Sequence, residues 1–284
     1  MAGASMKDIK LRIKSVQSTM QITKAMELVA SSKLRKAKER QELCRPYHVE
    51  LRKALDQIEA STNDFSSVYQ KQREIRKTCL IVIAGDRGLA GGYNGNIFKM
   101  VAGLNLDPEK VCVLPIGKRA VDHFNRRGYE ILTYDFAEAA TISVSDCFVI
   151  SKLITKGYAE AKFDKVVLVY TRLVSLLSQT PDTLDLLPLS PSQKQEKPSV
   201  RELTLYEPSA DAVYDSIVPN YIAGMMYGAM CESVASELAA RRTAMDAASQ
   251  NAEAMIEDLS LRFNRARQGA ITQEITEIVA GAEH

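Results

Sequence analysis

The sequence predicts an α/β fold combined with a long antiparallel coiled coil, in which the N- and C-terminal helices pair and an α/β domain is inserted between them. Three observations lead to this prediction. The last third of the chain carries an uninterrupted heptad seam, the first fifth carries a second one, and the region between them alternates short apolar strands with helices.

The C-terminal seam begins at Ile217 and proceeds in alternating steps of four and three residues. Only Arg242 and Ser249 depart from a rule of apolar or small residues, and no proline follows Pro219. At a rise of ~1.5 Å per residue such a helix runs roughly 90 Å, too long to bury itself in one domain, so it needs a partner helix or an enclosing protein. The seam positions are Ile217, Tyr221, Gly224, Gly228, Cys231, Ala235, Leu238, Arg242, Met245, Ser249, Ala252, Ile256, Leu259, Phe263, Ala266 and Ala270.

The N-terminal helix offers the partner. Between Ala4 and Arg45 no proline or glycine interrupts the chain, and Pro46 is the first predicted break. Small residues in the C-terminal seam would let two backbones approach closely. Periodicity alone leaves open a second arrangement, with two separate amphipathic helices in a bundle. The N-terminal seam is Ile9, Ile13, Val16, Met20, Thr23, Glu27, Ala30, Leu34 and Ala37, and a second apolar line beside it is Ile22, Met26 and Val29.

The middle of the chain predicts a mainly parallel sheet, since strands and helices alternate over short connections. Residues 179–199 contain four prolines and predict an exposed loop, with a short strand at Leu184–Leu189. A last strand is expected at Leu203–Tyr206. The domains are accordingly predicted as 1–60, 61–207 and 208–284. The other expected strands are Thr78–Ala84, Val111–Ile116, Tyr129–Tyr134 and Lys165–Thr171, and the expected helices are 96–103, Lys118–Arg127 and Val144–Ala161.

Composition narrows the class of protein. The 284 residues are 46% hydrophobic and 25% charged, as in soluble globular proteins. No apolar run reaches the ~18 residues of a membrane span, so we expect no direct transmembrane insertion. The five cysteines are dispersed and only three histidines are present, which argues against a metal site and favours a reducing compartment. Cys79 and Cys112 lie in apolar runs and are expected to pack as small hydrophobic residues.

Charge is unevenly distributed along the chain. The net charge is only +2, but residues 1–40 contain ten basic and three acidic side chains, and ten minus three gives +7. Such a run indicates either an anionic partner or a solvated helix face. Nucleic acid is a poor candidate for this partner, because the run is nearly free of aromatic residues and carries no recognised reading motif.

The glycine-rich loop Gly85–Asn96 follows a buried strand, which is where a phosphate-binding loop would lie. It contains neither G-x-G-x-x-G nor G-x-x-x-x-G-K-[ST], and Asp86 would repel a phosphate. A role in tight backbone geometry is favoured, so no cofactor is expected. An α/β enzyme that uses this loop for a phosphate ligand remains the alternative, although no nucleophile elbow or partnered histidine supports catalysis.

The C-terminal stretch Arg265–Ile275 is unusual in composition. Polar side chains surround a seam of small residues, which indicates contact with an enclosing protein on several sides or, more simply, an exposed helix face. The polar residues are Arg267, Gln268, Thr272 and Glu274, and the small seam residues are Ala266 and Ala270.

Four segments together resemble the γ subunit family of F-type ATP synthases. They are distributed from one end of the chain to the other, in the family's order and spacing. The segments are Met6–Ile13, Gln21–Ala30, Asp86–Asn94 and Ala266–Ala282.

This resemblance implies a coiled coil of both termini with a Rossmann-like α/β domain beside its foot. It also implies a non-catalytic central rotor shaft, enclosed by a ring of α and β subunits and docked with the ε subunit on the membrane c-ring. The expected location is peripheral, at the cytoplasmic face of a bacterial cell membrane. A coiled-coil scaffold without a motor role is a further alternative.

The resemblance also assigns roles to residues at matching positions. Tyr206 and Glu207 correspond to foot residues near the c-ring and ε. Gly269 stands where alanine is more usual, and Arg242 where an apolar residue is more usual. The dithiol insert of chloroplast relatives is absent, so redox control is not expected. The residues that correspond to ring contacts are Met26, Lys33, Arg35, Lys36, Arg241, Gln268, Thr272 and Glu274.

Overall fold

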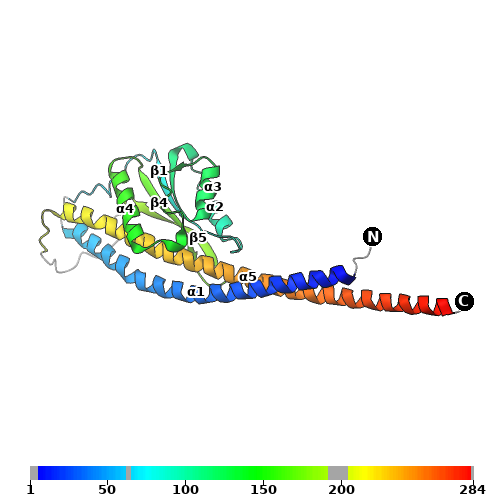
Figure 1. Cartoon of the computed structure of the whole chain (residues 1–284). Helices are drawn as coiled ribbons and strands as arrows, with labels where there is room; N and C mark the ends of the chain where they lie inside the picture. Colours follow the sequence, from blue (N-terminus) through cyan, green and yellow to red (C-terminus); the bar gives the residue numbers. More distant parts are fainter. Residues whose placement is uncertain (1–5, 62–64, 191–203, 283–284) are drawn as a thin grey trace. The chain divides into compact units, whose positions relative to one another are not determined.

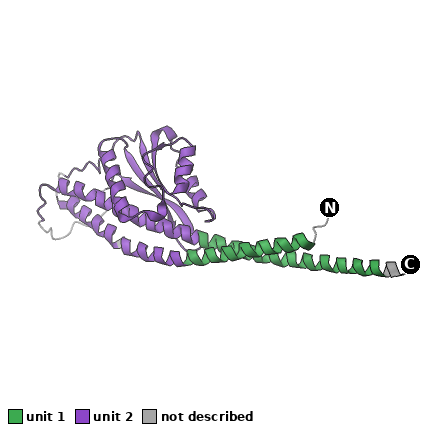
Figure 2. Ribbon diagram, in the orientation of Figure 1, with its two compact units in different colours: residues 1–31, 241–284 green, residues 32–240 purple. Residues whose placement is uncertain are grey.

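The computed structural model describes residues 6–61, 65–190 and 204–282. These residues divide into two compact units, with residues 1–31 and 241–284 in unit 1 and residues 32–240 in unit 2 (Figure 2). Two long helices pass through both units. They are α1 (Met6–Ser61) and α5 (Ala210–Ala282) (Figure 1).

In unit 1 the predicted seam positions are the most buried residues of both helices. Ile9 and Ala30 of α1 are buried, and so are Met245, Ala252 and Leu259 of α5. The residues between seam positions are mostly exposed. The two helices also meet through a polar layer, because the hydroxyl oxygens of Thr23 and Ser249 lie 2.6 Å apart. The buried Ser249 hydroxyl therefore has a hydrogen-bond partner across the seam, as a buried polar group requires.

Unit 2 shows the direction of the pair. Leu34 and Ala37 of α1 pack in one cluster with Ala235, Leu238 and Ala239 of α5. Farther along α1, Tyr47 and His48 lie against Gly224, where a methyl group would come within 2.9 Å of the tyrosine ring. Residue numbers rise on one helix as they fall on the other, so the pair is antiparallel. The predicted fold class and the close approach at small residues are confirmed.

The interruption predicted at Pro46 does not end the first helix. Helix α1 continues through this proline to Ser61. A proline inside a helix removes one hydrogen bond and costs about 3 kcal/mol or more. Leu55 and Ile58, in the turns that follow, are buried in the main core of unit 2, and this packing offsets the cost. Pro219 is likewise contained within α5.

Unit 2 also contains a five-stranded sheet of order β3-β2-β1-β4-β5. Strands β1 to β4 are parallel where they pair, and β5 runs antiparallel to β4. The strands are β1 (Thr78–Ile83), β2 (Val111–Ile116), β3 (Glu130–Ile131), β4 (Lys165–Leu173) and β5 (Gln179–Leu187). The helices of the domain are α2 (Tyr93–Gly103), α3 (Lys118–Arg126) and α4 (Val144–Ala159), with 3₁₀ turns at Pro108–Lys110 and Ala139–Thr141.

Each face of the sheet is covered by helices. Alternate residues of β1 point to opposite faces, so that Cys79 and Ile81 join a core with α4 and α5, while Leu80 and Val82 join a core with α2 and α3. Cys79 is thus buried as a small hydrophobic residue, as predicted, and so is Cys112. A strand buried on both faces explains the continuous apolar run in this part of the sequence.

Three predicted elements were wrong in extent or kind. Residues 179–183 form the first part of strand β5 instead of a loop, because the antiparallel ladder to β4 satisfies their backbone. The strand expected at Leu184–Leu189 is confirmed as far as Leu187, and residues 191–199 of the expected loop lie outside the described residues. The strand expected at 129–134 is shortened to two residues. Residues 204–206 form no strand, and Leu203 lies outside the described residues.

Candidate partner-contact surfaces

The second apolar line of α1 is exposed in unit 1. Ile22 and Val29 are 58% and 55% exposed, and Met26 between them is also exposed. These positions lie one and two turns apart on one side of the helix, adjacent to the closed seam. An apolar row that the chain itself leaves uncovered indicates a protein partner.

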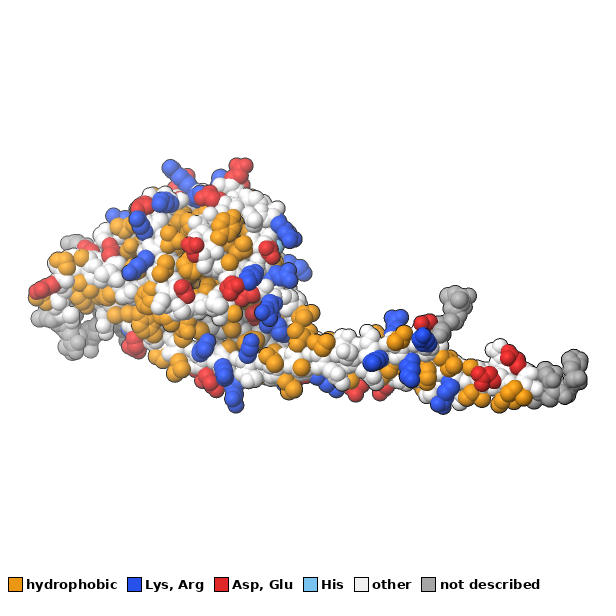
Figure 3. Space-filling view, viewed as in Figure 1, with side chains coloured by type: hydrophobic (Ala, Val, Ile, Leu, Met, Phe, Trp, Pro, Cys, Tyr) orange, Lys and Arg blue, Asp and Glu red, His pale blue; other side chains and the backbone are white. Residues whose placement is uncertain are grey.

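Basic side chains are exposed on the part of α1 that belongs to unit 2. Lys33, Arg35 and Lys36 are all exposed. Arg35 lies 4.0 Å from Glu39 on the same helix, an exposed pair that contributes little to stability. These cations are available to an anionic partner. Figure 3 shows Lys and Arg side chains (blue) and hydrophobic side chains (orange) exposed along the helices.

The end of α5 in unit 1 is exposed on all sides. From Ile271 to Ile278 every residue is exposed, including Thr272 and Glu274. The Thr272 hydroxyl donates to the carbonyl oxygen of Gln268 at 2.9 Å, one turn earlier in the same helix. Gln268 and Thr272 therefore share a face, whereas Glu274 is displaced around the helix. Arg241 differs from these residues, because it is half-buried.

The predicted foot residues lie at the start of the return into α5, in unit 2. Tyr206 is half-buried and packs against the main core. Glu207 is exposed and precedes Pro208 through a cis peptide bond. Leu205 is 84% exposed beside them. This short segment thus presents an apolar and an acidic side chain to the solvent.

The glycine-rich loop contains one carboxylate, that of Asp86, which is bonded to backbone groups outside the loop. The Asp86 carboxylate accepts hydrogen bonds from the backbone N–H groups of Lys118 (3.2 Å), Ala139 (2.9 Å) and Ala140 (3.1 Å). Lys118 is the first residue of α3, which follows β2, so this donor does not belong to α2, the helix that the glycine-rich loop precedes. Asp86 therefore ties the glycine-rich loop to the start of α3 and to the 3₁₀ turn at Ala139–Thr141.

The backbone around this loop is held by close approaches. The Asn94 side chain accepts a hydrogen bond from the N–H of Gly85 at 2.8 Å. Gly117 has a φ of +97°, and a methyl group there would lie 2.2 Å from the carbonyl oxygen of Ala84. Beside it, an ion pair of 2.6 Å with Glu138 raises the pKa of Lys118. Gly117 therefore serves tight backbone geometry beside the loop, whereas a methyl group at Gly95 within the loop would meet no atom within 4 Å.

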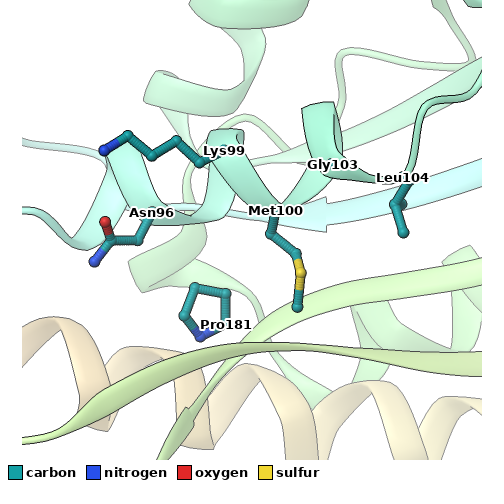
Figure 4. Close-up of a pocket in the computed structure, with 6 residues that line it drawn as sticks. All are labelled: Asn96, Lys99, Met100, Gly103, Leu104 and Pro181. Carbon is teal, nitrogen blue, oxygen red and sulfur yellow. The ribbon is translucent and has the colours of Figure 1, made fainter.

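A shallow hollow of about 440 Å³ lies between α2 and β5 (Figure 4). Met100, Leu104 and Pro181 supply its apolar lining, and Asn96 and Lys99 lie at its rim. Lys99 is the one ionisable side chain in this lining, and no second catalytic group lies beside it in the hollow. Among the described residues no group of three or more His, Cys, Asp or Glu side chains could hold a metal ion. The described helices also include none that is long and apolar enough to cross a membrane.

Sequence reasoning missed two polar arrangements. It treated Asp86 as a repulsive charge and did not anticipate its three backbone partners. It also missed Glu232, Ser233 and Ser236, whose side chains bond the backbone of β4. Polar residues at helical spacing among small buried ones were the available signal for this second group.

Comparisons with known proteins give a consistent result. Residues 5–284 match the family model described as ATP synthase. The ATP synthase gamma chain of Ruminococcus albus is 46% identical over 281 residues, which cover 97% of this chain and 96% of the relative. The sodium ion specific gamma chain of Acetobacterium woodii is 41% identical and covers 98% of each chain.

Solved structures agree in fold. A chain of the Euglena gracilis mitochondrial ATP synthase (OSCP/F1/c-ring) superposes with a TM-score of 0.68 at 17% identity, covering 98% of this chain and 93% of its own. A chain of the Tetrahymena thermophila central stalk and c-ring gives a TM-score of 0.60 at 24% identity, covering 80% of this chain and 99% of its own. From the family match and the full-length relatives, this chain belongs to the family of ATP synthase gamma chains.

Proposed function

We propose that this chain is the central rotor shaft of an F-type ATP synthase and is not itself catalytic. Ion flow through the membrane c-ring turns the chain, and the turning chain drives the catalytic sites on the β subunits through their conformations. Its place is peripheral, at the cytoplasmic face of a bacterial cell membrane. Membership of the gamma chain family supports this function.

One structural observation carries the proposal. The helix pair closes its own seam, yet α1 leaves a second apolar row exposed, and α5 is exposed on every side from Ile271 to Ile278. Apolar side chains at Ile275 and Ile278 are 56% and 71% exposed on this single helix. A surrounding ring of α and β subunits would cover both surfaces at once.

We assign the contacts with the ring to both helices. Met26 lies in the exposed apolar row, and Lys33, Arg35 and Lys36 supply positive charge for acidic loops of the β subunits. On α5 the proposed contacts are Arg241, Gln268, Thr272 and Glu274. At the foot, Tyr206 and Glu207 face the c-ring loops and the ε subunit.

The function is tested by reconstituting ATPase activity from α and β subunits with and without this chain. The full chain should raise turnover, and a bead attached through a Leu205→Cys variant should rotate, because this side chain is 84% exposed. Among the residues whose exposure is described, a variant that ends at Gln268 removes the exposed positions 269 and 271–278 and the half-buried Ala270. It should fold normally but support lower turnover. A full chain that neither binds the ring nor changes turnover would show the proposal to be wrong.

A charge reversal tests the basic surface separately. The double variant Lys33→Glu/Lys36→Glu should weaken association with the ring, most strongly at low salt, because exposed charges act over about 10 Å at 0.1 M salt. The control Lys152→Glu/Lys156→Glu reverses two exposed lysines of α4 and should leave association unchanged. Equal effects of both variants would exclude the assigned contact.

A further inference from the structure

Strand β4 extends further than β1, one of its two neighbours in the sheet. Its pairing with β1 ends where Val82 lies opposite Val169. Its pairing with β5 on the other side continues to Leu173, opposite Gln179. The last residues of β4 therefore have a strand neighbour on one edge only, and their remaining backbone groups need other partners.

Three side chains of α5 supply these partners. Ser233 Oγ accepts a hydrogen bond from Thr171 N at 3.1 Å, and Ser236 Oγ donates to the carbonyl oxygen of Thr171 at 3.1 Å. One Glu232 carboxylate oxygen accepts from Leu173 N at 3.1 Å. A helix face thus replaces the missing end of β1. We call Glu232, Ser233 and Ser236 the polar latch.

The two serines of the polar latch are shielded from water. Ser233 and Ser236 are fully buried, and Thr171 is 1% exposed. The Tyr93 hydroxyl, at the start of α2, donates to the carbonyl oxygen of Ser233 at 3.1 Å. Burial raises the pKa of this phenol, so it stays protonated and keeps donating. The sheet and α2 therefore both bond to the same turn of α5.

The loop after β1 approaches α5 at Glu237, one turn beyond Ser233. A methyl group on Gly85 would lie 2.7 Å from a carboxylate oxygen of Glu237, so glycine lets the loop pass this close to α5. At this level α5 therefore meets the sheet through directional polar contacts, beside the apolar packing of Leu173 against Ala235 and Leu238. Hydrogen bonds lose strength when their geometry shifts, whereas apolar contacts are non-directional and tolerate sliding.

We propose that the polar latch is the joint that makes the sheet domain and α5 turn as one body, so that torque received by the domain passes into the shaft. Glu232, Ser233 and Ser236 are in this view positioning residues for coupling. If the sheet slid along α5, buried donors and acceptors would lose their hydrogen-bond partners. Each unpaired buried group raises the free energy of the folded chain, so such sliding is unfavourable. The torque role rests on the proposed rotor function, whereas the latch itself does not.

Hydrogen exchange in the full chain tests the latch. The variant Ser233→Ala leaves the Thr171 N–H without its acceptor, and Glu232→Ala does the same to Leu173. The peptide that carries both amides should exchange roughly tenfold faster or more in either variant, as expected for a lost buried hydrogen bond. Glu232→Gln keeps an acceptor oxygen and should exchange nearly as the natural chain does. The control Ser216→Ala alters an exposed hydroxyl bonded within its own helix and should change nothing. Identical exchange in all variants would overturn the latch.

The torque role is tested in the assembled complex in vesicles, by the ratio of ions pumped to ATP hydrolysed. Glu232 is only half-buried, so Glu232→Ala is expected to fold. Its ratio should fall by about half or more, and Glu232→Gln should restore it. Faster exchange with an unchanged ratio would leave a structural contact and overturn the torque role. If the complex with the natural chain hydrolyses ATP without pumping, the rotor function fails, and the exchange result still decides whether the latch exists.

Discussion

Two glycines in the same seam of α5 allow the close approach of the helices to be measured. Gly224 and Gly228 lie one turn apart, and both face α1. A methyl group at Gly224 would lie 2.9 Å from the Tyr47 ring, whereas one at Gly228 would lie 3.9 Å from the His48 ring. The substitutions Gly224→Ala and Gly228→Ala are therefore chemically identical and differ only in what the methyl group meets.

The expected magnitudes follow from these distances. Replacing glycine by alanine inside a helix stabilises it by about 1 kcal/mol, and this gain applies at both positions. At Gly228 the contact is an ordinary one, so the full gain should appear. At Gly224 the ring of Tyr47 must move, and overpacking of this kind costs typically about 1–3 kcal/mol. We expect Gly228→Ala to stabilise the chain and Gly224→Ala to be neutral or destabilising by up to about 2 kcal/mol.

Thermal and urea unfolding of the two variants measure this difference. In a chain of this size 1 kcal/mol corresponds to a shift in Tm of roughly 2–4 °C. Tyr47→Ala removes the ring, so in that background Gly224→Ala should stabilise the chain as Gly228→Ala does. Equal shifts for both glycine variants, or no rescue by Tyr47→Ala, would refute the close packing of α1 on α5 at this level.

Other positions give sharp expectations. Gly269→Ala meets no atom within 4 Å, so it should stabilise the end of α5 by about 1 kcal/mol and slow hydrogen exchange there. Gly117→Ala should cost about 3 kcal/mol or more in urea unfolding, because a positive φ and a backbone clash add together, whereas Gly128→Ala has the positive φ but open space and should cost less. Ser143→Ala removes the cap of α4 and should cost about 1 kcal/mol. The backbone N–H and hydroxyl of this serine lower the pKa of Asp146. The ionised carboxylate therefore stabilises the folded chain above the ordinary aspartate pKa, and this contribution is lost as the pH falls through the lowered pKa of Asp146. Asp146→Asn should remove that pH dependence of unfolding.

The helices were predictable because their pattern repeats over many turns. In unit 1 the predicted seam positions coincide with the least exposed positions of α1 and α5. In unit 2 α5 is also buried at positions off the seam, such as Val218 and Ile222, because it packs in the main core with the sheet. Only the second half of strand β5, from Leu184, was predictable, because the proline and polar residues of 179–183 resemble a loop. Its strand conformation depends on pairing with β4, which is a tertiary contact.

The candidate site was predictable in part. The exposed row around Met26 follows from periodicity, since these positions lie beside a seam that one partner helix already fills. The polar latch could not be predicted from the sequence, because Ser233 and Ser236 look like small residues of an ordinary helix. Their role depends on a tertiary feature, namely that β4 extends beyond its pairing with β1. The roles of the individual ring and foot contacts, and the division at residues 60 and 207, stay predictions.

The single helix beyond Ala270 has a consequence for how the complex is built. Its residues up to Ile278 are exposed to solvent, and most of the stability of a helix in a protein comes from tertiary packing, which these residues lack within this chain. In the free chain this end should fray and re-form, and it would become ordered only when other subunits close around it. Part of the interaction free energy is then spent on folding the helix end, so the subunits would hold the end less tightly than its contact area suggests. Folding of this end and assembly of the ring would be one event, and a glycine at position 269 makes that folding step more costly.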